Sequence, residues 1–249
     1  MEKHGADKDV FCELLAELID EDPREFVKKI GLTGHRSWRT RQLTIDCLST
    51  ISRDCLLIGA RIGISDQSHH VRILAANLLA CNGTRADISR LLQALADQYW
   101  QVRSSAADGL GRLRSKKGED ALLSQLEIDE VPVVRRDIAL ALGCYGSKNM
   151  EKLIEVYEKE REDLSRIGML ISLYRIGRRD VISDYKKFLV SDDVILRSNA
   201  INLIDCVDIN GEDMRAIRQM LEDQLSIEPD EGLRQDIRNS IQRMSGFFI

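Results

Sequence analysis

The stretch Asp97-Gln98-Tyr99-Trp100-Gln101-Val102-Arg103-Ser104-Ser105-Ala106-Ala107-Asp108-Gly109-Leu110 carries a pattern that recurs along most of this chain. A related stretch begins at Val71, and another begins at Val134. Arginines mark the pattern at separations of 31, 31, 32, 31 and 31 residues: Arg41, Arg72, Arg103, Arg135, Arg166 and Arg197. A fixed period in this range is typical of stacked structural repeats, because one such unit is too small to bury its apolar face alone.

The composition favours helices packed on helices. Of the 249 residues, 43% are hydrophobic but only 5% are aromatic, so the core must be built from Leu, Ile, Val and Ala. The chain has only three prolines, which suits helices because proline removes a backbone donor. A formal net charge of −5 disfavours nucleic acid as the main partner, because proteins that bind it usually carry a basic surface.

The sequence carries no pattern typical of export or membrane insertion. Its first residues lack the apolar core of a signal peptide, and no later segment has about 18 uninterrupted apolar residues. The six cysteines form no Cys-x-x-Cys pair and the four histidines offer no nearby ligand set, so we expect no metal site. These patterns predict a cytoplasmic protein with reduced cysteines.

Each repeat is expected to hold a first helix, a short turn and a second helix that bears the arginine. Residues at offsets −1, +3, +4 and +7 from the arginine are mostly small or apolar, and these offsets share one face of a helix. The second helices are expected to begin near Trp38, His69, Trp100, Pro132, Asp163 and Val194. Glycines are expected to separate one helix pair from the next, at Gly83, Gly118, Gly146, Gly177 and Gly211.

We expect one continuous array over residues 1–249, because no linker or change of composition interrupts it. Residues 1–35 have helical periodicity without the repeat pattern, so they are expected to form N-terminal cap helices. Residues 36–211 hold the repeats, and residues 212–249 are expected to form a degenerate final repeat or a C-terminal cap.

The Asp-x5-Arg spacing, the Val-Arg-x-x-Ala-Ala motif and the period of 31 residues resemble those of HEAT repeats, above all the short bacterial kind found in phycobilisome lyase subunits. The resemblance covers about residues 36–205, and it is weaker where His35 or Glu160 stands in place of the aspartate. It implies an all-α solenoid of about six helix pairs with terminal caps. It also implies a right-handed superhelix whose second helices line a concave face.

Three aspartates precede an arginine by six residues, in the pairs Asp66/Arg72, Asp97/Arg103 and Asp129/Arg135. A carboxylate at this turn can accept hydrogen bonds from a neighbouring guanidinium and from free backbone amides, which would build a structural ladder between repeats. The alternative is a row of cations that binds an anion. On the structural interpretation, substitution of Arg103 lowers stability before it lowers binding.

A second face of the second helices lies opposite the buried one, at offsets −2, +1, +2, +5 and +9 from each arginine. Its apolar members gather on two repeats: Val133, Leu140, Leu164, Ile167 and Ile171. Polar and charged members surround them: Asp46, Asn77, Asp108, Arg112 and Arg136. One hypothesis is an exposed apolar patch with a polar rim, as in protein-binding surfaces. The alternative is that the apolar side chains pack between adjacent second helices.

No catalytic motif accompanies these repeats. The chain has no nucleophile elbow, no phosphate-binding glycine loop and no paired zinc histidines, so we expect neither an enzyme nor a cofactor. His69 and His70 are adjacent and are expected to point about 100° apart on a helix, too far to form one site. Tyr99 and Trp100 are expected to be packing residues rather than binding residues.

The leading hypothesis is a non-catalytic solenoid that binds another protein along its second helices. Such a protein could be an adaptor, an assembly subunit or an inhibitory, immunity-type partner, because this fold does not determine one function. The resemblance implies an alternative, a subunit that acts as a bilin lyase or chaperone. A third hypothesis is binding of alkylated DNA, which a nearly neutral surface fits poorly.

Overall fold

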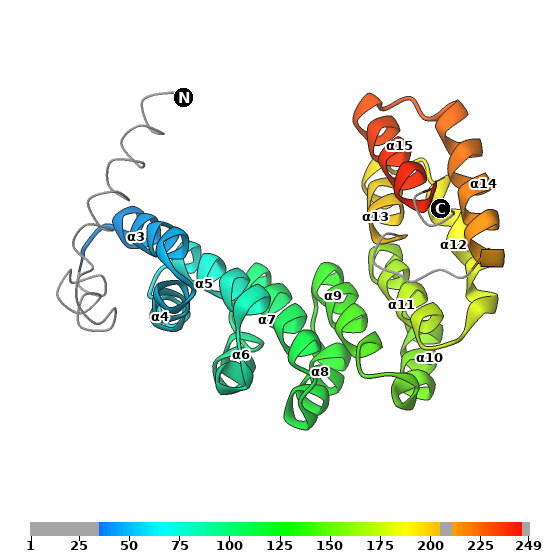
Figure 1. Cartoon of the computed structure of the whole chain (residues 1–249). Helices are drawn as coiled ribbons and strands as arrows, with labels where there is room; N and C mark the ends of the chain where they lie inside the picture. The colour runs from blue at the N-terminus through cyan, green and yellow to red at the C-terminus, as the bar shows by residue number, and fades with distance from the viewer. Residues whose placement is uncertain (1–34, 205–210, 246–249) are drawn as a thin grey trace. The chain divides into compact units, whose positions relative to one another are not determined.

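The computed structural model describes residues 35–204 and 211–245, and within these ranges the chain folds into helices without any strand. The fold is an all-α solenoid of helix pairs, as the period predicts (Figure 1). The chain divides into two compact units, Met1–Leu122 and Leu123–Ile249. The expected N-terminal cap helices lie outside the described residues. None of the described helices combines the length and the apolar character needed to cross a membrane.

In the first unit, the second helices α3, α5 and α7 pack side by side, and the first helices α4 and α6 pack against them. The bounds are α3 (Trp38–Ile51), α4 (Arg53–Gly63), α5 (His69–Asn82), η1 (Arg85–Asp87), α6 (Ile88–Ala94) and α7 (Trp100–Leu113). The helix α8 (Lys116–Ile128) contains the boundary between the two units.

In the second unit, the second helices α9, α11, α13 and α15 pack in that order. The first helices α10, α12 and α14 lie against them. The bounds are α9 (Pro132–Gly143), η2 (Ser147–Asn149), α10 (Met150–Lys159), α11 (Asp163–Arg175), η3 (Arg179–Val181), α12 (Ile182–Leu189), α13 (Val194–Ile204), α14 (Gly211–Ile227) and α15 (Glu231–Ser245).

The core follows the buried face that the periodicity predicts. On α7, the four residues at offsets −1, +3, +4 and +7 are all 0% exposed: Val102, Ala106, Ala107 and Leu110. The same offsets are buried on the other second helices up to α13, except that Thr40 and Leu196 are half-buried. On α5 and α7 the residues at +3 and +4 are alanines, so these two second helices can pack closely.

The second helices begin at the residues that the sequence predicts. Gly146 and Gly177 have φ angles of 89° and 113°, a region that favours glycine and suits a helix end. The expected break at Gly118 is wrong, because α8 has already begun at Lys116. Arg114 ends α7 instead, with a left-handed φ of 49° that a non-glycine residue can adopt at modest cost.

Residues 211–245 form another helix pair, α14 and α15, which is consistent with a final repeat. Arg234 on α15 stands where the repeat arginine stands on the other second helices, and it follows Arg197 by 37 residues rather than 31 or 32. The longer interval accommodates α14, which has 17 residues. The cysteines differ from one another. Cys55, Cys81 and Cys144 carry free thiols, whereas Cys47 is fully buried and disulfide-bonded, so the expectation of reduced cysteines does not hold for Cys47.

Candidate functional site

The repeating arginines bridge one repeat to the next. Arg72 on α5 donates from Nε and Nη2 to the two carboxylate oxygens of Asp97, at 2.6 and 3.0 Å. Its Nη1 donates to the carbonyl oxygen of Asp66 at 2.9 Å. The six-residue spacing therefore reflects a bond to a backbone carbonyl, and the carboxylate belongs to the following repeat. The same two-sided arrangement recurs in the pairs Arg41–Asp66, Arg135–Glu160 and Arg197–Glu228.

Each carboxylate of this ladder also holds the turn in which it lies. Asp97 accepts a hydrogen bond from the backbone N–H of Tyr99 at 2.9 Å, and Glu160 accepts one from the backbone N–H of Glu162 at 3.0 Å. The carbonyl that the arginine binds can come from any residue, and His35 supplies it to Arg41 at 2.7 Å. This explains why His35 and Glu160 can replace the aspartate without loss of the arrangement.

Arg166 is the exception among the ladder arginines of the second unit. Ser191 stands 25 residues after it, where the next carboxylate would stand. Its Nη2 donates to the hydroxyl of Tyr157 at 2.9 Å, and its guanidinium lies 4.4 Å from the centre of that ring. A cation over an aromatic face replaces the ion pair to the next repeat here, and Asp163 on the same helix lies 4.0 Å from Arg166 Nε.

The ladder is largely shielded from solvent, with paired side chains 0–15% exposed, and its carboxyl groups are held ionised. Burial alone would raise the pKa of Glu160, but hydrogen bonds from Arg135 and from the Glu162 N–H outweigh it and lower the pKa to about 2. In Asp66 and Asp97 the same opposition of burial and arginine hydrogen bonds leaves the pKa below its usual value. The guanidinium donors point at protein acceptors, which supports the structural interpretation over a row that binds anions.

Stability is expected to fall as the pH drops below about 4.5. The pKa of Glu160 is about 2 in the fold against 4.5 in the unfolded chain, so the unfolded chain takes up the proton first. The stabilisation is therefore present above pH 4.5 and is lost as the pH falls towards 2. The full difference corresponds to about 3 kcal/mol. In urea unfolding, the gap between wild type and Glu160→Gln should narrow with falling pH, and a constant gap would contradict this assignment.

In the first unit, the predicted polar residues lie on second helices as expected from their offsets. Asn77 and Asp108 are exposed, and Asp46 is half-buried. Arg112 pairs with Asp108 one turn away on α7, with 3.0 Å between Nε and Oδ2. Both side chains are at least half exposed, so the pair contributes little to stability. Asn77 accepts a hydrogen bond from Ser105 on the neighbouring helix at 2.5 Å.

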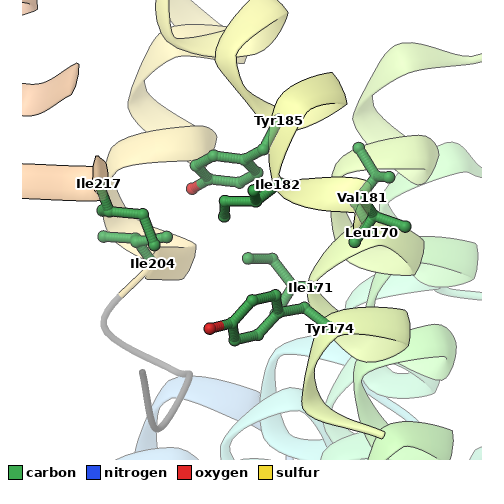
Figure 2. Close-up of a pocket in the computed structure, with 8 residues that line it drawn as sticks. All are labelled: Leu170, Ile171, Tyr174, Val181, Ile182, Tyr185, Ile204 and Ile217. Atoms are coloured by element: carbon green, nitrogen blue, oxygen red, sulfur yellow. The ribbon is translucent and has the colours of Figure 1, made fainter. Parts of the chain in front are cut away.

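In the second unit, the predicted apolar residues separate into two groups. Ile167 and Ile171 are 0% and 3% exposed, so the alternative of packing between helices describes these two. Ile171 points towards Ile217 of α14 rather than towards solvent (Figure 2). Val133, Leu140 and Leu164 are half-buried. These three, not the isoleucines of α11, present apolar atoms on the surface.

Figure 2 also shows the cavity that Ile171 lines with Tyr174, Tyr185 and other apolar side chains of α11–α14. Its volume is about 10 Å³, room for about one water molecule. It is a packing defect of the core rather than a ligand site. Among the described residues, no group of three or more His, Cys, Asp or Glu side chains could hold a metal ion.

Arg136 joins helices that are not adjacent. Its Nε donates to Asp137 at 2.7 Å, and its Nη1 donates to the side-chain oxygen of Asn199 on α13. Between them lies α11, where Gly168 leaves space for this side chain: a Cβ at Gly168 would stand 2.6 Å from Arg136 Cγ. Arg136 is therefore neutralised within the fold and positioned across the second helices.

The second unit also has exposed apolar residues that were not predicted from the sequence. Ile195 is 60% exposed and stands at offset −2 from Arg197, the offset of Val133 and Leu164 in their own repeats. Ile195 occupies offset −2 in the repeat that follows that of Leu164, so the same spacing predicts it. Other exposed apolar residues stand seven residues before the repeat arginine, near the ends of first helices: Ile128, Val190 and Ile227.

Aromatic rings connect three repeats of the first unit. The His69 and His70 rings lie 4.0 Å apart, so the expectation that they diverge is wrong. Each ring reaches towards a neighbouring repeat, where His70 stacks on Trp38 at 4.2 Å and His69 on Tyr99 at 3.9 Å. Tyr99 is a packing residue as expected, whereas Trp100 is 40% exposed.

A family model described as HEAT repeats matches residues 88–151. The fold resembles that of one chain in the structure of the complex of CpcE and CpcF of phycocyanin lyase from Nostoc sp. PCC7120, with a TM-score of 0.61 and 17% sequence identity. That match covers 90% of this chain and 95% of the other. Residues 88–151 of this chain therefore match HEAT repeats, and its fold is an all-α solenoid of the HEAT-like kind. A match to an archaeal HEAT-like repeats protein from Thermococcus onnurineus NA1 has a TM-score of 0.44 and 13% identity, and covers 91% of this chain and 98% of the other.

The chain also has a curated relative. It is 31% identical over 99 residues to Deoxyhypusine hydroxylase-B of Oryza sativa subsp. japonica. The matched segment is 39% of this chain, and the chain spans about a third, 33%, of that relative's length. The relative's activity belongs to a longer protein, so this match alone does not transfer it.

Proposed function

We propose that this HEAT-like solenoid is a non-catalytic scaffold that binds another protein through its second helices. The observation that carries the proposal is the surface of the second unit, where apolar side chains lie beside a neutralised arginine. Val133, Leu140 and Leu164 are half-buried there, and Ile195 is largely exposed. Partly exposed apolar groups within a polar rim are typical of surfaces that bind proteins. An adaptor, an assembly subunit and an inhibitory partner are all consistent with such a surface.

Site-specific photo-crosslinking tests this proposal. A photoreactive residue at Val133 on α9 is expected to capture a stoichiometric protein from native lysate. The same residue at Glu151, an exposed position on the first helix α10, is the matched control and is expected to capture none. Equal capture at the two positions, or no stoichiometric partner at either, would overturn the proposal.

A second candidate is a subunit of a lyase assembly that handles a bilin. Its support is the likeness to the CpcE and CpcF complex of phycocyanin lyase, which concerns the fold alone at 17% identity. This candidate predicts that the purified chain, with its partner subunit, attaches a bilin to an acceptor protein. Capture at Val133 of a protein unrelated to bilin attachment would favour the scaffold instead.

A further inference from the structure

The second residue of each of three successive second helices is apolar in the second unit. These residues are Val133 on α9, Leu164 on α11 and Ile195 on α13, each at offset −2 from its arginine. Because α9, α11 and α13 pack side by side, equal offsets place the three in a row across the helix starts. The row becomes more exposed along its length, from half-buried Val133 and Leu164 to Ile195 at 60%.

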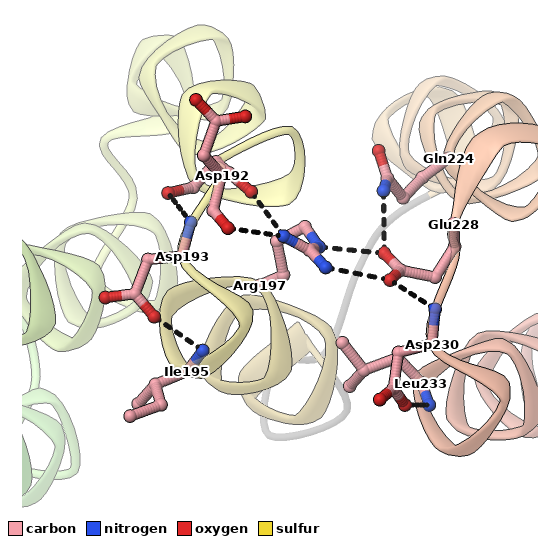
Figure 3. Close-up of polar contacts among 9 residues, drawn as sticks. Asp192, Asp193, Ile195, Arg197, Gln224, Glu228, Asp230 and Leu233 are labelled. Atoms are coloured by element: carbon pink, nitrogen blue, oxygen red, sulfur yellow. Dashed lines mark hydrogen bonds and ion pairs between the residues drawn. The ribbon is translucent and has the colours of Figure 1, made fainter.

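A groove of about 350 Å³ lies at the Ile195 end of this row, between the starts of α13 and α15. Its apolar lining is Val194, Ile195 and Leu233, of which Val194 is 45% exposed. Figure 3 shows Ile195 at the start of α13 and Leu233 at the start of α15, beside the ion pair of Arg197 with Glu228. Leu233 is only 5% exposed, so the groove offers a partner space and one accessible apolar wall, formed by Val194 and Ile195.

The charged residues that line the groove are both acidic, Asp230 and Asp236. Asp230 caps α15 through the N–H of Leu233 at 2.8 Å, so its carboxylate is fixed at the helix start. Two nearby cations are paired within the fold: Arg197 binds Glu228, and Arg136 binds Asp137. The groove is thus complementary to a positive charge rather than to an anion.

We infer that the row and the groove take one amphipathic segment of a partner protein, with apolar side chains along the row and a Lys or Arg in the groove. This inference rests on the proposed function and specifies the partner's chemistry. Apolar anchors in such a surface supply most of the binding free energy, and complementary charge selects the partner and its direction. An amphipathic helix laid across a groove is one recurring form of such recognition.

Fluorescence anisotropy with a defined peptide tests the inference. The probe is a labelled amphipathic helical peptide with Leu on one face and Lys on the other, and its control has Glu in place of Lys. The Lys peptide is expected to bind roughly tenfold tighter than the Glu peptide, and Asp236→Lys should remove that preference. Ile195→Ser should weaken binding of the Lys peptide roughly tenfold. Val190→Ser is the matched control, because Val190 is 53% exposed but does not line the groove, and it should change nothing.

Equal affinity for the two peptides, no binding, or equal effects of Ile195→Ser and Val190→Ser would overturn the inference. A dimer of this chain that Ile195→Ser dissociates, detected by analytical ultracentrifugation, would identify a second copy as the occupant and would also overturn it. Circular dichroism melting of each variant separates lost binding from lost folding.

The proposed function has its own test, and it fails if crosslinking at Val133 captures no protein. A photoreactive residue can also be placed at Ile195. If the residue at Val133 captures a protein and the one at Ile195 does not, the proposed scaffold function stands but the groove is not part of its binding surface.

Discussion

Arg197→Met is expected to lower the free energy of unfolding by about 3–5 kcal/mol, the usual cost of removing one partner of a buried ion pair. The Glu228 side chain is 0% exposed, and its carboxylate accepts hydrogen bonds from Arg197 Nε and Nη2 at 2.8 and 2.9 Å (Figure 3). Methionine fills part of the space but leaves this carboxylate without its counter-charge. Gln224 and the N–H of Asp230 remain as donors, at 2.8 and 3.1 Å, and they carry no full charge.

Arg166→Met is the matched control for this ladder. Arg166 makes the same kind of bond to a backbone carbonyl, that of Glu160 at 2.9 Å, but it contacts Tyr157 where the others hold a carboxylate of the next repeat. Its loss strands no buried carboxylate, so we expect a cost of about 1 kcal/mol. Urea unfolding at neutral pH, followed by circular dichroism, measures both. Equal costs for the two variants would refute the claim that the buried carboxylate decides the effect.

The ladder illustrates what the sequence could and could not predict. The period identified the arginines, and the helical offsets identified the core residues at −1, +3, +4 and +7, because both depend on local spacing. The six-residue spacing predicted a ladder between repeats, but it did not identify the carboxylate that each arginine binds. That spacing reports a bond from Arg72 to the carbonyl of Asp66, while the carboxylate partner is Asp97. A backbone acceptor leaves no signature in the residue type.

The candidate surface was harder to predict because burial depends on neighbours distant in sequence. Offsets place Ile171 and Leu140 at the same register, yet Ile171 is covered by residues of α12–α14 and Leu140 is not fully covered. The contact of Arg136 with Asn199 joins residues 63 apart. Such contacts depend on how α9, α11 and α13 pack, which periodicity alone does not determine.

Gly168→Ala is expected to lower the free energy of unfolding by about 2 kcal/mol, although alanine is the better helix former by about 1 kcal/mol. A Cβ at Gly168 would lie 2.7 Å from the carbonyl oxygen of Arg136 and 3.0 Å from its Cα. These are backbone atoms of α9, which cannot move aside as a flexible side chain can. The helices α9 and α11 must separate, and the bond from Arg136 to Asn199 must change with them.

Gly211→Ala provides the control for helix propensity. Gly211 begins α14, and a Cβ there would meet nothing within 4 Å, so we expect no loss of stability. The comparison separates close approach of helices from the preference of glycine itself. Urea unfolding measures both variants, and crosslinking at Val133 should weaken in Gly168→Ala because α9 carries that residue. Unchanged stability of Gly168→Ala would mean that α9 and α11 are farther apart than described, and the row of Val133, Leu164 and Ile195 would lose its geometric basis.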